Sequence, residues 1–307
     1  LEHPLPLPEY TVQHCDPARP ATSIYVNPLR RRWEIMVLPG DDPAELVQPA
    51  AVWRLLQRWV KPAQATLSRA ATYVFHSLLS EDWQRGRLLL AGDAAHQTPP
   101  FLGQGLCAGV RDAANLAWKL AHAVRSGCER LLSTYGSERK PHARAFIALA
   151  VELGHIIQLT DASQAARRDA RLLAGQTSFA FPTPQLGAGA HHGPPPAGQI
   201  FIQPMLADGR WMDDVVGDAF ALVMRRDATN ALAAAARREF AALGVAVLDD
   251  AGDDAHAWLS GHDAIAVIVR PDRYVFEVVR QTADLAAAAD RLGRWLFSTV
   301  DHNEETS

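Results

Sequence analysis

Residues 87–105 read RLLLAGDAAHQTPPFLGQG, and the fold expected of the chain follows from this stretch. The apolar residues 88–90 end at Gly92-Asp93, and a histidine, two prolines and two further glycines follow. A short apolar run that enters a glycine turn is typical of a strand buried in a parallel sheet. Ligands bind at the carboxyl edge of such sheets, so we expect the Asp93 carboxylate to accept hydrogen bonds from hydroxyl groups of a ligand.

The residues after this turn predict a second ligand-binding feature, which is the start of a helix. Small and aliphatic residues recur at helical spacing from Gly105 to Val124, which predicts a closely packed helix. The first N–H groups of a helix have no intrahelical partner and favour negative charge on a ligand. The stretch therefore offers a carboxylate to hydroxyl groups and, further along, amide donors to a planar anion, which suits a long ligand.

The rest of the first 180 residues alternates between strand and helix patterns. Alternating β-forming residues predict an antiparallel meander over 10–38, with turns at the Asp-Pro and Asn-Pro pairs. Apolar spacing predicts one or two helices over 42–60. The remaining expected elements are a strand over 71–80, a helix over 129–159 bent near Pro141, and a short helix over 163–175.

The C-terminal third reads as a separate small α/β unit behind a linker, 181–199, that is rich in proline and glycine. Strands are predicted over 220–225, 245–249, 264–270 and 274–279, and helices over 230–243 and 282–297. This order is typical of a thioredoxin-like fold, and the unit holds no cysteine, which excludes thiol redox chemistry in it. We therefore expect a mixed α/β chain with four parts: a sheet region over 1–84, long helices and the ligand turn over 85–180, a linker over 181–199, and a thioredoxin-like domain over 200–307.

Composition narrows the class of protein. The formal net charge is −4 and no basic block is present, so nothing predicts a nucleic-acid or anionic-membrane partner. No apolar run is long enough to span a membrane, and no signal peptide is recognisable at the start. The three cysteines are widely spaced and form no CxxC pair, so we expect neither a disulfide framework nor a metal site, and the cytoplasm is the expected compartment.

The segment GRLLLAGDAAHQTPPFLGQGLCAGVRDAANLAWKL, residues 86–120, resembles the second flavin-binding motif of the FAD-dependent aromatic hydroxylases, which are class A flavoprotein monooxygenases. Within that family the chain is most similar to the 3-(3-hydroxyphenyl)propionate hydroxylase group. The segments that carry this finer similarity are CDPARPAT at 15–22, RRRWEIMVLPG at 30–40, YGSERKPHARAFIALAVELG at 135–154 and VIVRPDRYVFEVV at 267–279. The resemblance covers almost the whole chain, and it implies the C-terminal part of the family's FAD- and substrate-binding domain followed by a thioredoxin-like domain. It further implies that 1–84 is a sheet region that covers the substrate and that 85–180 is the second part of the FAD-binding domain.

The resemblance implies roles for individual residues. Asp93, with Gly92 beside it, would bind the ribityl hydroxyls of FAD, and Pro100 would lie beside the flavin with its carbonyl near the hydroxyl of an aromatic substrate. The residues that would line the pyrimidine end of the flavin are Gly103, Gln104, Gly105 and Leu106. The resemblance further implies NAD(P)H and O₂ as co-substrates, a flavin hydroperoxide as the oxygen donor, hydroxylation of a phenol, and the option of a homodimer.

One departure from the family concerns the pyrophosphate of FAD. No GxGxxG occurs in the sequence, although the family's FAD domain begins with one. We expect that the chain is truncated ahead of Leu1, rather than a degenerate fragment, and that alone it binds FAD weakly or not at all. Two alternatives stay open: a non-catalytic binding or oligomerisation module built on the hydroxylase scaffold, and a hydroxylase of a polyketide-type phenol.

Some nearby residues are given structural interpretations. His96 is expected to make a structural hydrogen bond at the turn rather than to move protons. Arg111 and Asp112 are expected to form a local ion pair. Candidates to line a substrate pocket are Trp33, Met36 and His76, although a role in the sheet core is favoured for each.

Overall fold

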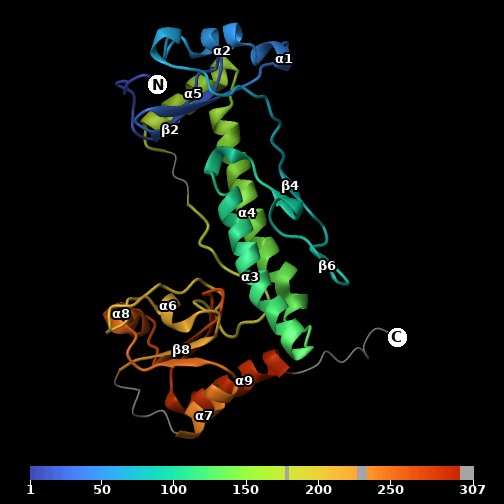
Figure 1. Cartoon of the computed structure of the whole chain (residues 1–307), viewed down its shortest axis with the longest axis vertical. Helices are drawn as coiled ribbons and strands as arrows, with labels where there is room; N and C mark the ends of the chain where they lie inside the picture. Colours follow the sequence, from blue (N-terminus) through green and yellow to red (C-terminus); the bar gives the residue numbers. More distant parts are fainter. Residues whose placement is uncertain (177–179, 227–233, 298–307) are drawn as a thin grey trace. The chain divides into compact units, whose positions relative to one another are not determined.

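The computed structural model describes residues 1–176, 180–226 and 234–297, and Figure 1 traces its elements. The chain divides into two compact units. Unit 1 contains Leu1–Ser77, Thr98–Gly103 and Ile147–Phe181, and unit 2 contains Leu78–Gln97, Gln104–Phe146 and Pro182–Ser307. The domain boundaries expected at residues 84, 180 and 199 stay a prediction.

Unit 1 contains the antiparallel meander predicted over 10–38. Its strands are β1 (Val12–His14), β2 (Ala21–Asn27) and β3 (Arg30–Ile35), and they pair in the order β1-β2-β3 with Thr22 opposite Glu34. The turn between β2 and β3 is closed by the side chain of Asn27, whose Oδ1 accepts a hydrogen bond from the N–H of Leu29 at 3.0 Å. The helices α1 (Pro43–Leu46) and α2 (Pro49–Leu56) follow, as expected.

Two predicted strands are wrong. Residues 71–77 form no strand, and Tyr73 and Val74 are exposed; the β-forming pattern there meets no neighbouring strand, within the described residues, to pair its backbone. Only Leu78–Leu79 (β4) pairs, antiparallel to β7 (His96–Gln97). The apolar run before Gly92 contributes β6 (Leu88–Leu89), which is neither buried nor parallel: it pairs antiparallel with β5 (Gln84–Arg85) across a turn in which Gly86 has φ +57°, and Leu88 is 76% exposed.

The helices after the turn agree with the sequence pattern. The predicted helix at 105–124 is α3 (Gly105–Ser126), which ends at Gly127 in the left-handed conformation. The next helix, α4 (Tyr135–Ile157), begins after a 3₁₀ turn at Leu132–Thr134, later than predicted, and contains Pro141. The short helix α5 (Ala162–Leu173) begins at Asp161, whose carboxylate accepts a hydrogen bond from the N–H of Gln164.

The C-terminal part of unit 2 is built on a four-stranded sheet in the order β11-β10-β8-β9. Strand β8 is parallel to β9, and the other neighbours are antiparallel. The strands are β8 (Ala221–Met224), β9 (Ala246–Leu248), β10 (Ala266–Val269) and β11 (Val275–Val279), and the helices are α6 (Met212–Val216), α7 (Ala234–Ala242), α8 (Gly252–Gly261) and α9 (Leu285–Phe297). All four strands and both helices predicted here are confirmed within the described residues, and residues 230–233 of the helix predicted over 230–243 lie outside them. Helices α6 and α8 were not predicted.

Buried charges join α3, the first half of α4 and the β10–β11 turn inside unit 2. The Glu138 carboxylate lies 2.8 Å from Lys119 Nζ and 2.8 Å from Arg270 Nη2, and Arg270 also pairs with Asp272 at 2.7 Å. The side chains of these four residues are completely buried or nearly so. Within unit 2, these ion pairs link α3 to the first half of α4 and join both to the turn between β10 and β11.

Candidate functional site

The Gly92-Asp93 turn is the centre of the candidate ligand-binding segment in unit 2. Residues Gly92–Ala94 form a 3₁₀ turn, and Gly92 has φ +58°, a conformation that glycine adopts without strain. A Cβ built on Gly109 of α3 would lie 3.4 Å from the Gly92 Cα, so the turn and the helix meet backbone to backbone. Asp93 is exposed, and its carboxylate makes no hydrogen bond or ion pair with any residue that the structure describes. This carboxylate is available to a ligand.

The buried carboxylate of Asp112 on α3 holds the Gly92-Asp93 turn in place. Asp112 Oδ2 accepts hydrogen bonds from the Gly92 N–H at 3.1 Å and from His96 Nε2 at 2.7 Å. Asp112 Oδ1 accepts one from Arg139 Nε at 2.9 Å. The predicted ion pair between Arg111 and Asp112 is therefore wrong, because adjacent residues of a helix do not face each other. The structural hydrogen bond expected of His96 is confirmed, since His96 donates to Asp112. In the sequence, Asp112 is a charged residue within the stripe of small residues on α3, and this exception is the signal that marks it.

The start of α3 presents free amide donors, as the sequence predicted. Gln104 occupies the N-cap position, and its side chain makes no capping hydrogen bond. The first helical bond runs from the Ala108 N–H to the Gln104 carbonyl at 2.9 Å. In the described part of the chain, the N–H groups of Gly105, Leu106 and Cys107 have no recorded acceptor. Three donors at a helix N-terminus make a site for negative charge.

Unit 1 contains the segment between these two features. Residues Pro100–Leu102 form a 3₁₀ turn that ends at Gly103, with φ +63°, and the Gly103 N–H donates to the Pro100 carbonyl at 2.9 Å. A carbonyl oxygen has two lone pairs, so the Pro100 carbonyl can accept a second hydrogen bond from a ligand.

A cavity of about 500 Å³ lies inside unit 1, and Pro100 is in its wall. Its lining residues come from β2, β3, residues 71–77, the Pro99–Phe101 segment and the second half of α4. Trp33 and Met36 contribute, as was considered from the sequence, whereas His76 is not among the lining residues. Phe75, Pro99, Pro100 and Phe101 are among the lining residues, so the cavity offers apolar surface to a flat ring.

The polar lining residues of this cavity come from several segments, among them Glu34 on β3 and Tyr73 in residues 71–77. Glu34 forms an ion pair with Arg32 at 2.9 Å. Although much of the Tyr73 side chain is exposed, partial burial together with the nearby Glu34 charge raises the pKa of Tyr73, so this phenol stays protonated at neutral pH. The cavity therefore combines a hydrogen-bond donor and a carboxylate with its apolar lining.

Gly154 of α4 makes room for one cavity residue. A Cβ built on Gly154 would lie 2.5 Å from Phe101 Cε2, far inside normal contact. Only glycine lets the Phe101 ring lie against the helix in this position. The Pro99–Phe101 segment is thus shaped by α4 as well as by its own prolines.

The sequence of this chain is similar to those of known proteins. Residues 17–150 match the sequence model of a family described as "FAD binding domain". A probable NADH-specific resorcinol 4-hydroxylase of Rhodococcus jostii is 35% identical over 306 residues, which cover 91% of this chain and 56% of the relative. A 3-(3-hydroxy-phenyl)propionate/3-hydroxycinnamic acid hydroxylase of Burkholderia cenocepacia is 35% identical over 308 residues, covering 86% and 57%.

Over residues 17–150 the chain matches the FAD-binding domain family, and the two relatives named above are aromatic hydroxylases. The fold is also similar to a solved one: the flavin-dependent monooxygenase PieE, solved with FAD and substrate, superposes with a TM-score of 0.73 at 22% identity, over 92% of this chain and 60% of that one. The chain spans little more than half the length of the curated relatives it matches.

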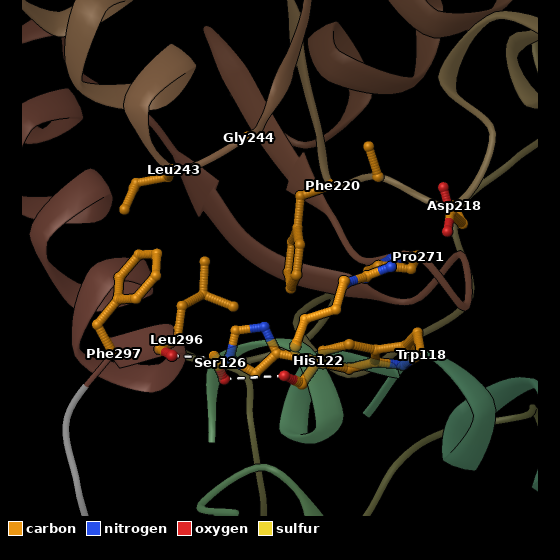
Figure 2. Close-up of a pocket in the computed structure, with 12 residues that line it drawn as sticks. Trp118, His122, Ser126, Asp218, Phe220, Leu243, Gly244, Pro271, Leu296 and Phe297 are labelled. Atoms are coloured by element: carbon orange, nitrogen blue, oxygen red, sulfur yellow. Dashed lines mark hydrogen bonds between the residues drawn. The ribbon is translucent and has the colours of Figure 1, made fainter. Parts of the chain in front are cut away.

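A second cavity lies in unit 2, between α3 and the C-terminal sheet (Figure 2). Its volume is about 480 Å³, and Trp118, Phe220 and Phe297 are among its lining residues. Two polar side chains in Figure 2 already have partners: His122 Nε2 donates to the Leu296 carbonyl at 2.7 Å, and Ser126 Oγ donates to the His122 carbonyl at 2.8 Å. None of the residues expected to bind FAD or substrate lines this cavity.

Two further features of the described residues bear on metal binding and on membranes. No group of three or more His, Cys, Asp or Glu side chains is arranged to hold a metal ion in residues 1–176, 180–226 and 234–297. In the same residues no single helix is long and apolar enough to cross a membrane, and one pair, Leu132–Ile157 with Ala162–Leu173, reaches that length and composition only across a 112° bend.

Proposed function

We propose that this chain forms the flavin- and substrate-binding part of a monooxygenase that uses FAD, NAD(P)H and O₂ to hydroxylate a phenolic ring. The observation that carries the proposal is the arrangement in unit 2, where an exposed Asp93 carboxylate without a partner follows a turn packed on the helix that presents three free amides. The names of the curated relatives, which are phenol hydroxylases, support the reaction class.

The residues of unit 2 fit the chemistry of FAD. The Asp93 carboxylate is an acceptor for the ribityl hydroxyls, and the turn at Gly92 lets the backbone approach the cofactor closely. The N–H groups of Gly105 and Leu106, next to Gln104 and Gly103, are donors for the pyrimidine end, where reduction of the flavin places negative charge. FAD, when bound, supplies the transfer of electrons from the nicotinamide and the activation of O₂.

The cavity of unit 1 fits an aromatic substrate. The apolar surface around Phe101 and Phe75 holds the ring, and the Pro100 carbonyl accepts a hydrogen bond from its hydroxyl group, which fixes the carbon that is hydroxylated. The apolar lining excludes water from the reacting atoms. A simple phenol, such as resorcinol or 3-(3-hydroxyphenyl)propionate, is the proposed substrate, and the volume of about 500 Å³ also admits a larger polyketide-type phenol.

The remaining proposals concern organisation. Residues 200–297 are proposed to be a thioredoxin-like domain, because β8, α7 and β9 form a parallel unit that is followed by the β10–β11 hairpin and α9. The cytoplasm is the proposed compartment, and the thiols of Cys15 and Cys107, which form no disulfide with a described residue, are consistent with reducing conditions.

The first test measures FAD binding. The purified chain is titrated with FAD while flavin fluorescence is followed, and binding is expected to be saturable and weak. Asp93→Asn should weaken it about tenfold, the value of a lost hydrogen bond to a charged group. Asp253→Asn, at a side chain that is 99% exposed, is the matched control and should leave the affinity unchanged. Equal affinity in all three proteins contradicts the proposal.

The second test measures turnover in the full-length protein that contains this chain. NADH and NADPH oxidation is recorded with a panel of phenols, and the products are identified by mass spectrometry. A phenol with one added oxygen is the expected product. FAD binding with no phenol-dependent product supports the alternative of a non-catalytic binding module.

A further inference from the structure

We propose that Asp112 is a positioning residue for the flavin: it fixes the Gly92-Asp93 turn against α3, so that the carboxylate of Asp93 and the amides at the start of α3 keep one relative geometry. This inference rests on the proposed function. It assigns a role to a residue that touches neither cofactor nor substrate.

The contacts of Asp112 carry the inference. One carboxylate oxygen accepts both the Gly92 N–H at 3.1 Å and His96 Nε2 at 2.7 Å, and the other accepts Arg139 Nε at 2.9 Å. The side chain of Asp112 has no exposed surface. Because Gly92 and His96 lie on either side of Asp93, Asp112 holds both flanks of the exposed residue.

The backbone packing explains why a carboxylate is needed. A Cβ on Gly109 would come within 3.4 Å of the Gly92 Cα, so at this point the turn and helix have no side chains that interlock. Asp112 lies one helical turn after Gly109 and reaches back to the turn from the buried side of α3. Its hydrogen bonds therefore replace side-chain packing as the link between the two ligand-binding features.

The charge of Asp112 is maintained in this buried position. Burial would raise the pKa of its carboxyl group, but the hydrogen bond from His96 and the charge of Arg139 outweigh burial, and the pKa is lowered. Arg139 is itself held, because its Nη2 donates to His142 Nδ1 at 3.1 Å, and His96 stacks on Trp83 with ring centroids 5.4 Å apart. A carboxylate accepts three hydrogen bonds here, and an amide at this position turns one acceptor into a donor.

The test compares Asp112→Asn with Lys119→Met. Lys119 is buried on the same face of α3, two turns further along, and it bonds Thr134 and Glu138 rather than the Gly92-Asp93 turn. Both variants are expected to be less stable than the parent chain. Hydrogen–deuterium exchange at single amides, measured by NMR below the unfolding transition, should rise about tenfold or more at Gly92 in Asp112→Asn only. In Lys119→Met the exchange rate of the Gly92 amide should not rise more than the exchange rates of the amides in α3.

FAD titration of the same proteins gives the second readout. Asp112→Asn should bind FAD about tenfold more weakly than the parent chain, while Lys119→Met binds within about twofold. If Asp112→Asn binds FAD as well as the parent, or if exchange rises evenly along α3 in both variants, the inference is wrong and the proposed function stands. If neither the parent chain nor the full-length protein that contains it shows saturable FAD binding, the proposed function fails, and the exchange at Gly92 still decides whether Asp112 holds the turn.

Discussion

Replacing Glu138 with glutamine tests whether the buried charges of unit 2 act as one structural unit. Glu138 accepts five hydrogen bonds, which come from Asn115, Lys119, the Ala190 N–H and two nitrogens of Arg270, over 2.7 to 3.0 Å. Burial alone would raise the pKa of Glu138, but the charges of Arg270 and Lys119 outweigh it and hold the pKa well below its usual range. The carboxylate is therefore ionised at neutral pH.

The expected loss of unfolding free energy in Glu138→Gln follows from the balance of the buried charges. Lys119 and Arg270 are opposed by Glu138 and Asp272, and all four side chains are fully buried or nearly so. Glu138→Gln leaves one positive charge in excess and turns one acceptor into a donor that faces other donors. Loss of one partner from a buried ion pair costs about 3–5 kcal/mol, and we expect the free energy of unfolding of unit 2 to fall by that amount.

The measurement is urea unfolding followed by tryptophan fluorescence and far-UV circular dichroism. Trp118 is a reporter close to the substituted group, because the Arg270 guanidinium lies 5.2 Å from its ring. Glu129→Gln is the matched control, since Glu129 faces Arg87 at 3.9 Å with both side chains largely exposed, and it should leave the midpoint unchanged. A loss below about 1 kcal/mol in Glu138→Gln, at an unchanged m-value, refutes the reasoning.

Two further predictions concern pH and the cavity of unit 1. Burial, aided by the charge of Arg139, lowers the pKa of His142 from 6.5 to about 3; the folded state then binds fewer protons than the unfolded state between these values, so the free energy of unfolding falls by up to about 1.4 kcal/mol per pH unit as pH drops from 6.5 towards 3. His142→Asn should flatten this slope in urea titrations from pH 6.5 to 4, and an unchanged slope contradicts the assignment. Gly154→Ala should displace the Phe101 ring, since its Cβ would lie 2.5 Å from Cε2, and weaken phenol binding about tenfold. Gly136→Ala, with its Cβ 3.5 Å from the nearest side-chain atom, fits on the same helix and should leave phenol binding unchanged; equal affinity in both variants refutes this role for Gly154.

Elements with a local signal were predictable from the sequence. The meander at 10–38 has alternation and a proline-marked turn, and α3 has a stripe of small residues that continues over its whole length. The C-terminal strands are continuous apolar runs, and all four are fully or partly buried in the sheet. In each case the pattern within one segment is enough, because the period of burial is set by the geometry of the element itself.

Elements that depend on distant partners were not predictable in the same way. The β-forming residues 71–77 form no strand, since a strand needs a neighbour that the pattern does not name. The apolar run at Leu88 became an exposed hairpin strand because Gly86 closes a tight turn just ahead of it. The hydrogen bond between Asn115 and Asp272 joins residues 157 positions apart, and each of them alone resembles an ordinary polar surface residue.

In the candidate site, the residues proposed to bind a ligand have local sequence signals, whereas the residues that support them depend on distant partners. Residues expected to touch a ligand, such as Asp93 and Gly105, were predicted because a glycine turn and a helix start follow general backbone rules. The residues that hold them in place, Asp112 and Arg139, interact across 27 positions and needed coordinates to be paired. The sequence motif therefore indicates which groups are proposed to face the flavin, whereas the accuracy of their placement depends on buried polar contacts that the motif alone does not reveal. For this reason we expect variants at Asp112 to change FAD affinity as strongly as variants at Asp93, although only Asp93 is proposed to touch the cofactor.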